Sequence, residues 1–351
     1  MEREALVIAP DAAASAAPLA HVLRGEHVES VHRGHVAVVD DRGRLLAWAG
    51  APRSMIYPRS AFKPFQALPL VESGAFGRSG LKADALALIA GSHSGTDRHA
   101  AIARTILEAA GVDESALRCG SHSPYDDATA EALRARGEAP TPIRHNCSGK
   151  HAGMLLMARF LDAPLASYTD ADHPVQRRIF DRFAALMGES FVDPVPAIDG
   201  CSAPTPRMPL RTLAYSFALL GRGRDAEGKA LPALFEIRDA MRAHPDLVAG
   251  EGRLDTLLMR AVPGAVTKAG AEGVHAIALP DRGIGIALKI EDGSRRALGP
   301  AVVSTLEALG VIGAAERSAL ARHAGERLRN FAGIEVGEIR GIARLEQEAA
   351  G

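Results

Sequence analysis

Several ordinary ingredients are scarce in this sequence of 351 residues, and each scarcity argues against a class of protein. Aromatic residues make up only 4% of the chain, and no basic stripe with interleaved aromatics is present, so we expect no nucleic-acid partner. No apolar run reaches the roughly 18 to 20 residues of a membrane-spanning helix, so we expect no membrane segment. The 47% hydrophobic content and the net charge of -1 are typical of a globular chain that buries a large core.

Cysteine is also rare, with one residue each at positions 119, 147 and 201. An odd number of cysteines without a secretory context favours free thiols, or a metal-binding pair with one spare cysteine, over a disulfide framework. Residues 1–8 lack the basic start, apolar stretch and cleavage site of a signal peptide, which predicts a cytoplasmic protein.

The most informative scarcity is that of lysine. Among the 41 basic residues only six are lysine, at positions 63, 82, 150, 229, 268 and 289. Three of these, Lys63, Lys150 and Lys268, lie in short segments rich in glycine, serine or cysteine. Arginine keeps its proton in a protein, whereas a desolvated lysine can become neutral and act as a base or a ligand. These three lysines are therefore candidates for chemistry, although a compositional bias against lysine could also leave them there at random.

The hydrophobic pattern predicts strands at both ends of the chain and helices between them. Residues 35–39 and 44–48 form one expected hairpin, residues 273–279 and 284–290 a second, and residues 334–340 a last strand. Helices are expected near residues 97–110, 126–136, 151–162, 174–187, 207–220, 231–243, 253–261, 295–309 and 314–329. We therefore predict one α+β domain over residues 1–351, with a mostly antiparallel sheet whose first and last strands come together.

A serine and a lysine three residues apart form the first chemical motif, Ser60-Ala-Phe-Lys63. At this spacing the two side chains share a helix face, so a neutral Lys63 could accept the proton of Ser60. A second copy ending at Lys82 shows that chance matches occur, and we interpret that lysine as a surface residue. Downstream, Lys268-Ala-Gly follows the order of serine acyl enzymes that carry Lys-[Ser/Thr]-Gly, with alanine in place of the hydroxyl residue.

Two cysteines could form a metal site. Cys147 lies in Arg144-His-Asn-Cys-Ser-Gly-Lys-His151, and Cys201 follows Ile198-Asp-Gly. Two thiolates and a nitrogen ligand can hold zinc and leave one position for water. His151 or His145 would be the ordinary third ligand and lysine an unusual one, while single, widely separated cysteines are also commonly just buried.

Taken together, these motifs resemble the asparaginase II family of bacterial L-asparaginases, the rhizobial type. The resemblance spans roughly residues 8–345 and rests on six motifs in order, namely Arg59-Ser-Ala-Phe-Lys-Pro64, Gly91-Ser-His-Ser-Gly95, Cys119-Gly, His145-Asn-Cys-Ser-Gly-Lys-His151, Ile198-Asp-Gly-Cys-Ser202 and Thr267-Lys-Ala-Gly270. It implies a fold like that of serine β-lactamases and glutaminases, a homodimer, and hydrolysis of L-asparagine to L-aspartate and ammonia.

The resemblance also implies roles for individual residues. It assigns two Ser-Lys pairs, Ser60 with Lys63 and Ser92 with Lys268, and a zinc site of Cys147, Lys150 and Cys201. Arg59, His151 and Asp199 would orient the substrate; by charge, Asp199 suits its ammonium and Arg59 its carboxylate. The alternatives are a glutaminase or other serine β-lactamase-like amidohydrolase, and a non-catalytic metal-binding module. A glutaminase is close in chemistry, because one methylene of substrate length discriminates only weakly.

Overall fold

The computed structural model describes residues 15–187 and 196–347. Its main sheet has nine strands, with the path β11-β12-β1-β2-β10-β9-β8, β3 on β2 and β13 on β3, and every pairing is antiparallel. The strands are β1 (Ala17–Arg24), β2 (His27–Asp40), β3 (Leu45–Ala49), β8 (Val266–Gly270), β9 (Val274–Leu279), β10 (Ile284–Ile290), β11 (Gly325–Arg329), β12 (Glu335–Gly341) and β13 (Glu346–Gln347). The expected α+β class with a mostly antiparallel sheet is confirmed.

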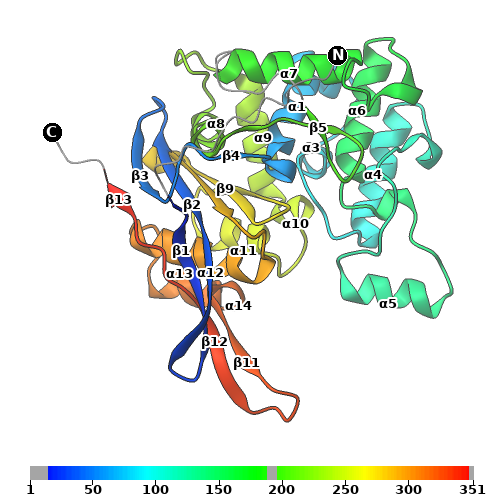
Figure 1. Ribbon diagram of the computed structural model, residues 1–351. Coiled ribbons are helices and arrows are strands. Elements are labelled where there is room, and N and C mark those ends of the chain that lie inside the picture. The colour runs from blue at the N-terminus through cyan, green and yellow to red at the C-terminus, as the bar shows by residue number, and fades with distance from the viewer. Residues whose placement is uncertain (1–14, 188–195, 348–351) are drawn as a thin grey trace, which may run out of the picture.

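Helices gather beside and on both faces of this sheet (Figure 1). Within the described residues they are α1 (Lys63–Glu72), α2 (Ala75–Arg78), α3 (Ala83–Ile89), α4 (Asp97–Ala109), α5 (Asp127–Ala135), α6 (Ser148–Phe160), α7 (Pro174–Met187), α8 (Leu210–Arg222), α9 (Pro232–Ala243), α10 (Pro245–Val248), α11 (Leu254–Ala261), α12 (Arg295–Ala308), α13 (Ala314–Ala319) and α14 (Ala321–Ala324). The middle helices expected from the sequence are all found, with ends that differ by a few residues. None of the helices described is both long and apolar enough to cross a membrane.

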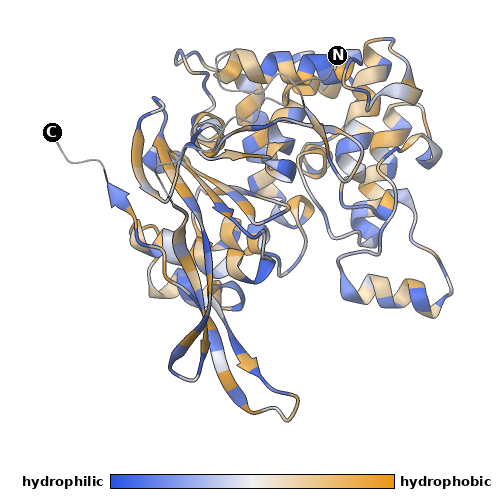
Figure 2. Ribbon diagram, in the orientation of Figure 1, coloured by the Kyte–Doolittle hydropathy of each residue, from blue (hydrophilic) through white to orange (hydrophobic). Residues whose placement is uncertain are grey.

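Alternate residues of β2 face opposite sides of the sheet, so this strand contributes side chains to two hydrophobic cores. Ala37 and Val39 point to the core on the side of α8, whereas Val36 and Val38 point to the core on the side of α12. Successive side chains of a strand face opposite sides of the sheet, so this run of four buried residues serves both faces. Figure 2 shows mixed hydrophilic and hydrophobic colour on the peripheral hairpins and helices, where one side of the element faces solvent.

A glycine lets the central helix approach the sheet. A Cβ atom at Gly285 in β10 would lie 1.9 Å from the backbone oxygen of Ala214 in α8, far inside van der Waals contact. Only glycine allows α8 to lie so close to the sheet at this position.

Two sequence predictions need correction at the ends of the sheet. The expected helix over residues 314–329 ends at Ala324, and Gly325–Arg329 instead forms β11, because these residues pair with β12 along the hairpin. The first described strand does pair directly with β12 as expected, but that strand is β1, which the sequence analysis missed; the predicted strand over 35–39 lies in β2, one strand further along the sheet. The last strand itself, expected at 334–340, is found as Glu335–Gly341.

Candidate active site

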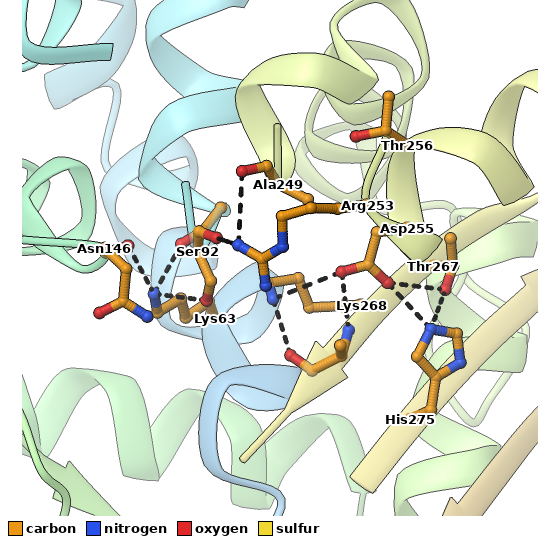
Figure 3. Close-up of polar contacts among 12 residues, drawn as sticks. Lys63, Ser92, Asn146, Ala249, Arg253, Asp255, Thr256, Thr267, Lys268 and His275 are labelled. Atoms are coloured by element: carbon orange, nitrogen blue, oxygen red, sulfur yellow. Dashed lines mark hydrogen bonds and ion pairs between the residues drawn. The ribbon is translucent and has the colours of Figure 1, made fainter. Parts of the chain in front are cut away.

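The segments singled out by sequence meet where the end of β8 approaches the helices. Lys63 begins α1, Ser92 follows α3, and Lys268 lies in β8. Figure 3 shows the side chains of these three residues in one polar group with Arg253 and Asp255. Residues separated by up to about two hundred positions in the chain thus share one site.

The segment that carries Ser60 is a short 3₁₀ helix, η1 (Arg59–Phe62), which continues into α1. Pro64 lies in the first turn of α1, where a missing backbone donor is tolerated. Arg59 has a φ of 52°, a left-handed conformation that costs a residue with a Cβ on the order of 1 kcal/mol. This strained residue directly precedes Ser60, as is common at functional sites.

Gly270 at the end of β8 fixes the distance between the two halves of the site. A Cβ atom there would lie 2.4 Å from the backbone oxygen of Pro58, directly before η1. The glycine of the Lys268-Ala-Gly motif therefore allows the strand that carries Lys268 to pack against the segment that carries Ser60.

Lys63 is fully buried, and its ammonium has three neighbours. Its Nζ atom lies 2.6 Å from the backbone oxygen of Gly91, 2.8 Å from Ser92 Oγ and 3.4 Å from the backbone oxygen of Asn146. Burial lowers the pKa of Lys63, and the Lys150 cation lowers it further, although the Cys147 and Cys201 sulfurs oppose the change. The hydroxyl that Lys63 contacts is thus that of Ser92.

Ser60 and Ser92 both line a cleft of about 420 Å³. This volume falls within the range of small-molecule sites. Among the described residues, the Ser60 hydroxyl has no hydrogen-bond partner, so Ser60 faces the cleft without the contact to Lys63 that its spacing suggests. The cleft is also lined by Asn146, Arg253 and Glu272.

Lys268 is fully buried beside the same cleft. Its Nζ atom donates to the backbone oxygen of Ala269 at 2.7 Å and lies 3.9 Å from Asp255 Oδ2. Burial lowers the pKa of Lys268 to about 7; Asp255 raises it, while Lys63 and Arg253 lower it. Near neutral pH this amine therefore exists in both protonation states. Its hydrogen-bond partner is Ala269, and no bond to Ser92 is made among the described residues.

Cys147, Lys150 and Cys201 form a buried cluster next to Lys63. Lys150 Nζ donates to Cys201 Sγ at 2.9 Å. The hydrogen bond between the two sulfurs raises the pKa of Cys147 and lowers that of Cys201, and Lys150 and His151 also favour the Cys201 thiolate. Burial would lower the pKa of Lys150, but Cys201 and Cys147 together raise it. Cys147 is therefore a neutral thiol, and the Lys150 ammonium balances the buried Cys201 thiolate.

This donor set fits a zinc ion. Two sulfurs and an amine nitrogen converge, and Nε2 of His151 is buried without a hydrogen-bond partner among the described residues. Sulfur and nitrogen are the donors that zinc prefers. No group of three His, Cys, Asp or Glu residues in the described ranges could hold a metal ion, so a zinc site here would need the lysine. His145, the other ligand considered from sequence, uses Nδ1 to accept from the Cys147 amide at 3.0 Å.

The substrate-orienting residues expected from the resemblance lie in two places. Arg59 and Asp199 form an ion pair, with Arg59 Nε 2.7 Å from Asp199 Oδ1, directly beside Ser60. Asp199 also accepts from the amide of Gly200 at 2.7 Å, so it shapes the turn as well. His151 is completely buried, and its Nδ1 lies 2.7 Å from the Tyr168 hydroxyl. None of Arg59, Asp199 and His151 is among the described residues that line the cleft.

Sequence reasoning missed Asp255 and Arg253, which contribute to the same site. Asp255 accepts hydrogen bonds from the amide of Ala269 and from His275, and Arg253 donates to the backbone oxygen of Ser92 at 2.7 Å. Neither residue stands in a recognisable motif. Only their positions at the start of a predicted helix, shortly before Lys268 in the chain, hint at a role.

Comparison with known proteins identifies relatives at the family level. A family model described as L-asparaginase II matches residues 20–341. A search of curated proteins found no match.

The solved structures similar to this one include a glutaminase. A structure of Mglu in its native form shares 17% identity and covers 78% of this chain and 63% of that chain, with a TM-score of 0.37. This chain therefore spans less than two thirds of the Mglu chain. A probable glutaminase from Bacillus subtilis complexed with 6-diazo-5-oxo-L-norleucine shares 11% identity, covers 79% of this chain and 84% of that chain, and has a TM-score of 0.39. At such scores these similarities carry no inference about the site.

Proposed function

The chain belongs to the L-asparaginase II family of amidohydrolases, and from this premise we propose that it hydrolyses L-asparagine to L-aspartate and ammonia through a serine acyl-enzyme. The observation that carries the proposal is the contact of 2.8 Å between Lys63 Nζ and Ser92 Oγ at the wall of a cleft that Ser60 also lines. A nucleophile within hydrogen-bond reach of a base is the arrangement that covalent catalysis requires.

The hydrogen-bond geometry around Lys63 can serve a neutral amine as well as an ammonium. A neutral amine has two N–H bonds and one lone pair, and Lys63 has two carbonyl acceptors, Gly91 and Asn146, and one hydroxyl, Ser92. The protonated amine donates to all three oxygens; once neutral, its two N–H groups would satisfy the carbonyls and its lone pair would accept the Ser92 proton. Lys63 is therefore oriented to act as a general base, and burial favours the neutral form that this role needs.

The reaction proceeds in two steps. The lysine takes the serine proton while the serine oxygen bonds to the side-chain amide carbon; the carbon–nitrogen bond then breaks and the lysine returns the proton to the leaving ammonia. Water next attacks the acyl carbon, giving a proton to the lysine, and the ester bond breaks to release aspartate and restore the serine. Ser92 is the hydroxyl in contact with Lys63, and Ser60 is the second candidate nucleophile. Lys268 lies at the same cleft as a second base.

The ion pair of Arg59 and Asp199 suits the remaining part of the substrate. Free L-asparagine carries one carboxylate and one ammonium group on its α-carbon. Arg59 would contact the carboxylate and Asp199 the ammonium, so each charge of the zwitterion meets its opposite beside Ser60. A substrate that lacks either charge would leave one partner unmatched, which favours a free amino acid over a peptide.

Zinc is part of the proposal, held by Cys147, Lys150 and Cys201. When bound, it would supply a fixed positive charge beside the cleft. Lys150 would then be neutral as a ligand, and His151, which lowers the pKa of Cys201, would stabilise the Cys201 thiolate.

We also include the homodimer that the resemblance implies; sedimentation velocity of the purified protein would test it.

Parallel ammonia-release assays with L-asparagine and L-glutamine test the proposal directly. We expect asparagine to be the better substrate by kcat/KM; a preference for glutamine would replace the asparaginase assignment with a glutaminase. Nitrocefin turnover serves as a third arm, and strong turnover there with no ammonia release would indicate β-lactam chemistry. Mass spectrometry of a trapped acyl adduct would show whether it lies on Ser92 or Ser60. An adduct on neither serine would overturn the mechanism.

A further inference from the structure

Asp255 is a buried carboxylate in the wall of the cleft, and four groups surround its two oxygens. It lies in the first turn of α11 and is only 1% exposed. Oδ1 accepts from His275 Nε2 at 2.9 Å and from Thr267 Oγ1 at 3.2 Å. Oδ2 accepts from the amide of Ala269 at 3.1 Å and lies 3.9 Å from Lys268 Nζ. Both oxygens are therefore fixed, and one of them faces the Lys268 amine (Figure 3).

The charge of Asp255 matters because of the other charges around Lys268. The titratable and charged groups near Lys268 and Asp255 come from several elements. They are Lys63 from α1, Cys147 before α6, Arg253 and Asp255 itself from the start of α11, and His275 from β9. Arg253 is a cation, Lys63 adds a second positive charge when it is protonated, and Lys268 has no access to solvent. Asp255 is the ionised carboxylate among them, because His275 and Lys268 hold its pKa well below the usual range despite burial.

We propose that Asp255 is a positioning residue for Lys268: it anchors the strand through the Ala269 amide, fixes the position of the Lys268 amine next to the wall of the cleft and balances its charge. This inference rests on the proposed function only in giving Lys268 a part in catalysis. The effect of the Asp255 charge on the pKa of Lys268 does not depend on which substrate the protein uses.

The sign of the effect follows from the surroundings. Burial, Lys63 and Arg253 all favour a neutral Lys268, and Asp255 opposes them. An opposite charge within about 4 to 6 Å shifts a pKa by roughly 1 to 3 units. Removing the charge of Asp255 should therefore lower the pKa of Lys268 from about 7 by about one unit or more.

Asp255→Asn is the sharpest variant, since it keeps the shape and removes the charge. Its side-chain oxygen can still accept from the Ala269 amide. Its amino group can face His275, because Nδ1 of His275 is buried without a partner among the described residues and can carry the ring proton instead. Glu272→Gln is the matched control: Glu272 lines the same cleft but is exposed, and it is not among the groups that shift the pKa of Lys268.

The test is a pH titration of the full-length protein labelled with ¹³C at the lysine Cε atoms. Only six lysines are present, so the spectrum is simple, and Lys268→Met assigns the resonance. We expect the Lys268 pKa to fall by about one unit or more in Asp255→Asn and to stay in place in Glu272→Gln. If Asp255→Asn does not fold, Asp255→Ser gives the same prediction. An unchanged Lys268 pKa in a folded charge-removing variant would overturn the proposal.

Activity provides the second, separable readout. The acidic limb of kcat/KM against pH should move to lower pH in Asp255→Asn by the same amount as the titration, whereas a purely structural defect would lower the rate at every pH without moving the limb. If the Lys268 pKa falls but the acidic limb of the kcat/KM profile does not move, Lys268 has no part in setting the rate, whereas the effect of Asp255 on the Lys268 pKa stands. A protein with no amidohydrolase activity would refute the proposed function, while the titration would still decide the role of Asp255.

Discussion

Gly270→Ala tests whether the packing of β8 against η1 sets the geometry of the site. The added Cβ atom would lie 2.4 Å from the backbone oxygen of Pro58. Ordinary contact begins near 3.4 Å, so β8 and η1 must separate by about 1 Å. Both partners are constrained, because the obstacle is backbone and not the end of a flexible side chain.

The shift would move Lys268 away from the segment that carries Ser60. Misplacement of catalytic groups by about 1 Å can cost on the order of 100-fold in rate. Overpacking of this kind destabilises a protein by about 1 to 3 kcal/mol. We therefore expect Gly270→Ala to fold, with a lower free energy of unfolding and a kcat/KM reduced by about two orders of magnitude.

The assay combines ammonia release from L-asparagine with urea denaturation followed by circular dichroism. Gly77→Ala in α2 is the matched control, because a Cβ there meets nothing within 4 Å; its stability should stay equal or rise slightly and its rate should not change. A folded Gly270→Ala enzyme with the rate of the unmodified protein would refute the reasoning, since it would mean that the site tolerates the separation.

Three further predictions concern the lysines and the cysteines. Lys63→Met should lower kcat by about 10²- to 10⁴-fold, and Lys63→Arg should be comparably impaired at every pH because arginine cannot become neutral; substantial activity in the arginine variant would show that Lys63 is a fixed cation. The kcat/KM for asparagine should rise as pH passes about 7, because Lys268, the proposed second base, can accept a proton only when it is neutral and its pKa is lowered to about 7; a flat profile from pH 6 to 9 would contradict this. Purified protein should contain about one zinc per subunit by elemental analysis, lost in Cys201→Ser and kept in Cys119→Ser; equal zinc in both variants would place the metal elsewhere.

Local patterns identified most elements of the fold. The helices of the middle region and both predicted hairpins have apolar residues at the spacing of a helix or a strand, and the structure contains these elements. The region after residue 314 is where the pattern was misleading. Its residues could continue a helix, but Gly325–Arg329 became a strand because the neighbouring β12 offered backbone partners that no local signal reveals. The strand β1 was missed for the same reason, since its identity depends on the two strands that flank it.

The sequence by itself determined which residues are candidates for chemistry. Scarce lysines beside serines and cysteines pointed to Lys63, Lys150 and Lys268, and in the structure Lys150 Nζ lies 2.9 Å from Cys201 Sγ. Tertiary structure alone decided the partners. Helical spacing suggested Ser60 for Lys63, but η1 is a 3₁₀ turn and the loop after α3 brings Ser92 to the amine. Asp255 reaches Lys268 across two elements, and a buried charge pair leaves no periodic signal in the chain. Spacing constrains only contacts along one element, whereas the contacts that set the pKa of Lys268 form between elements whose packing depends on the whole core.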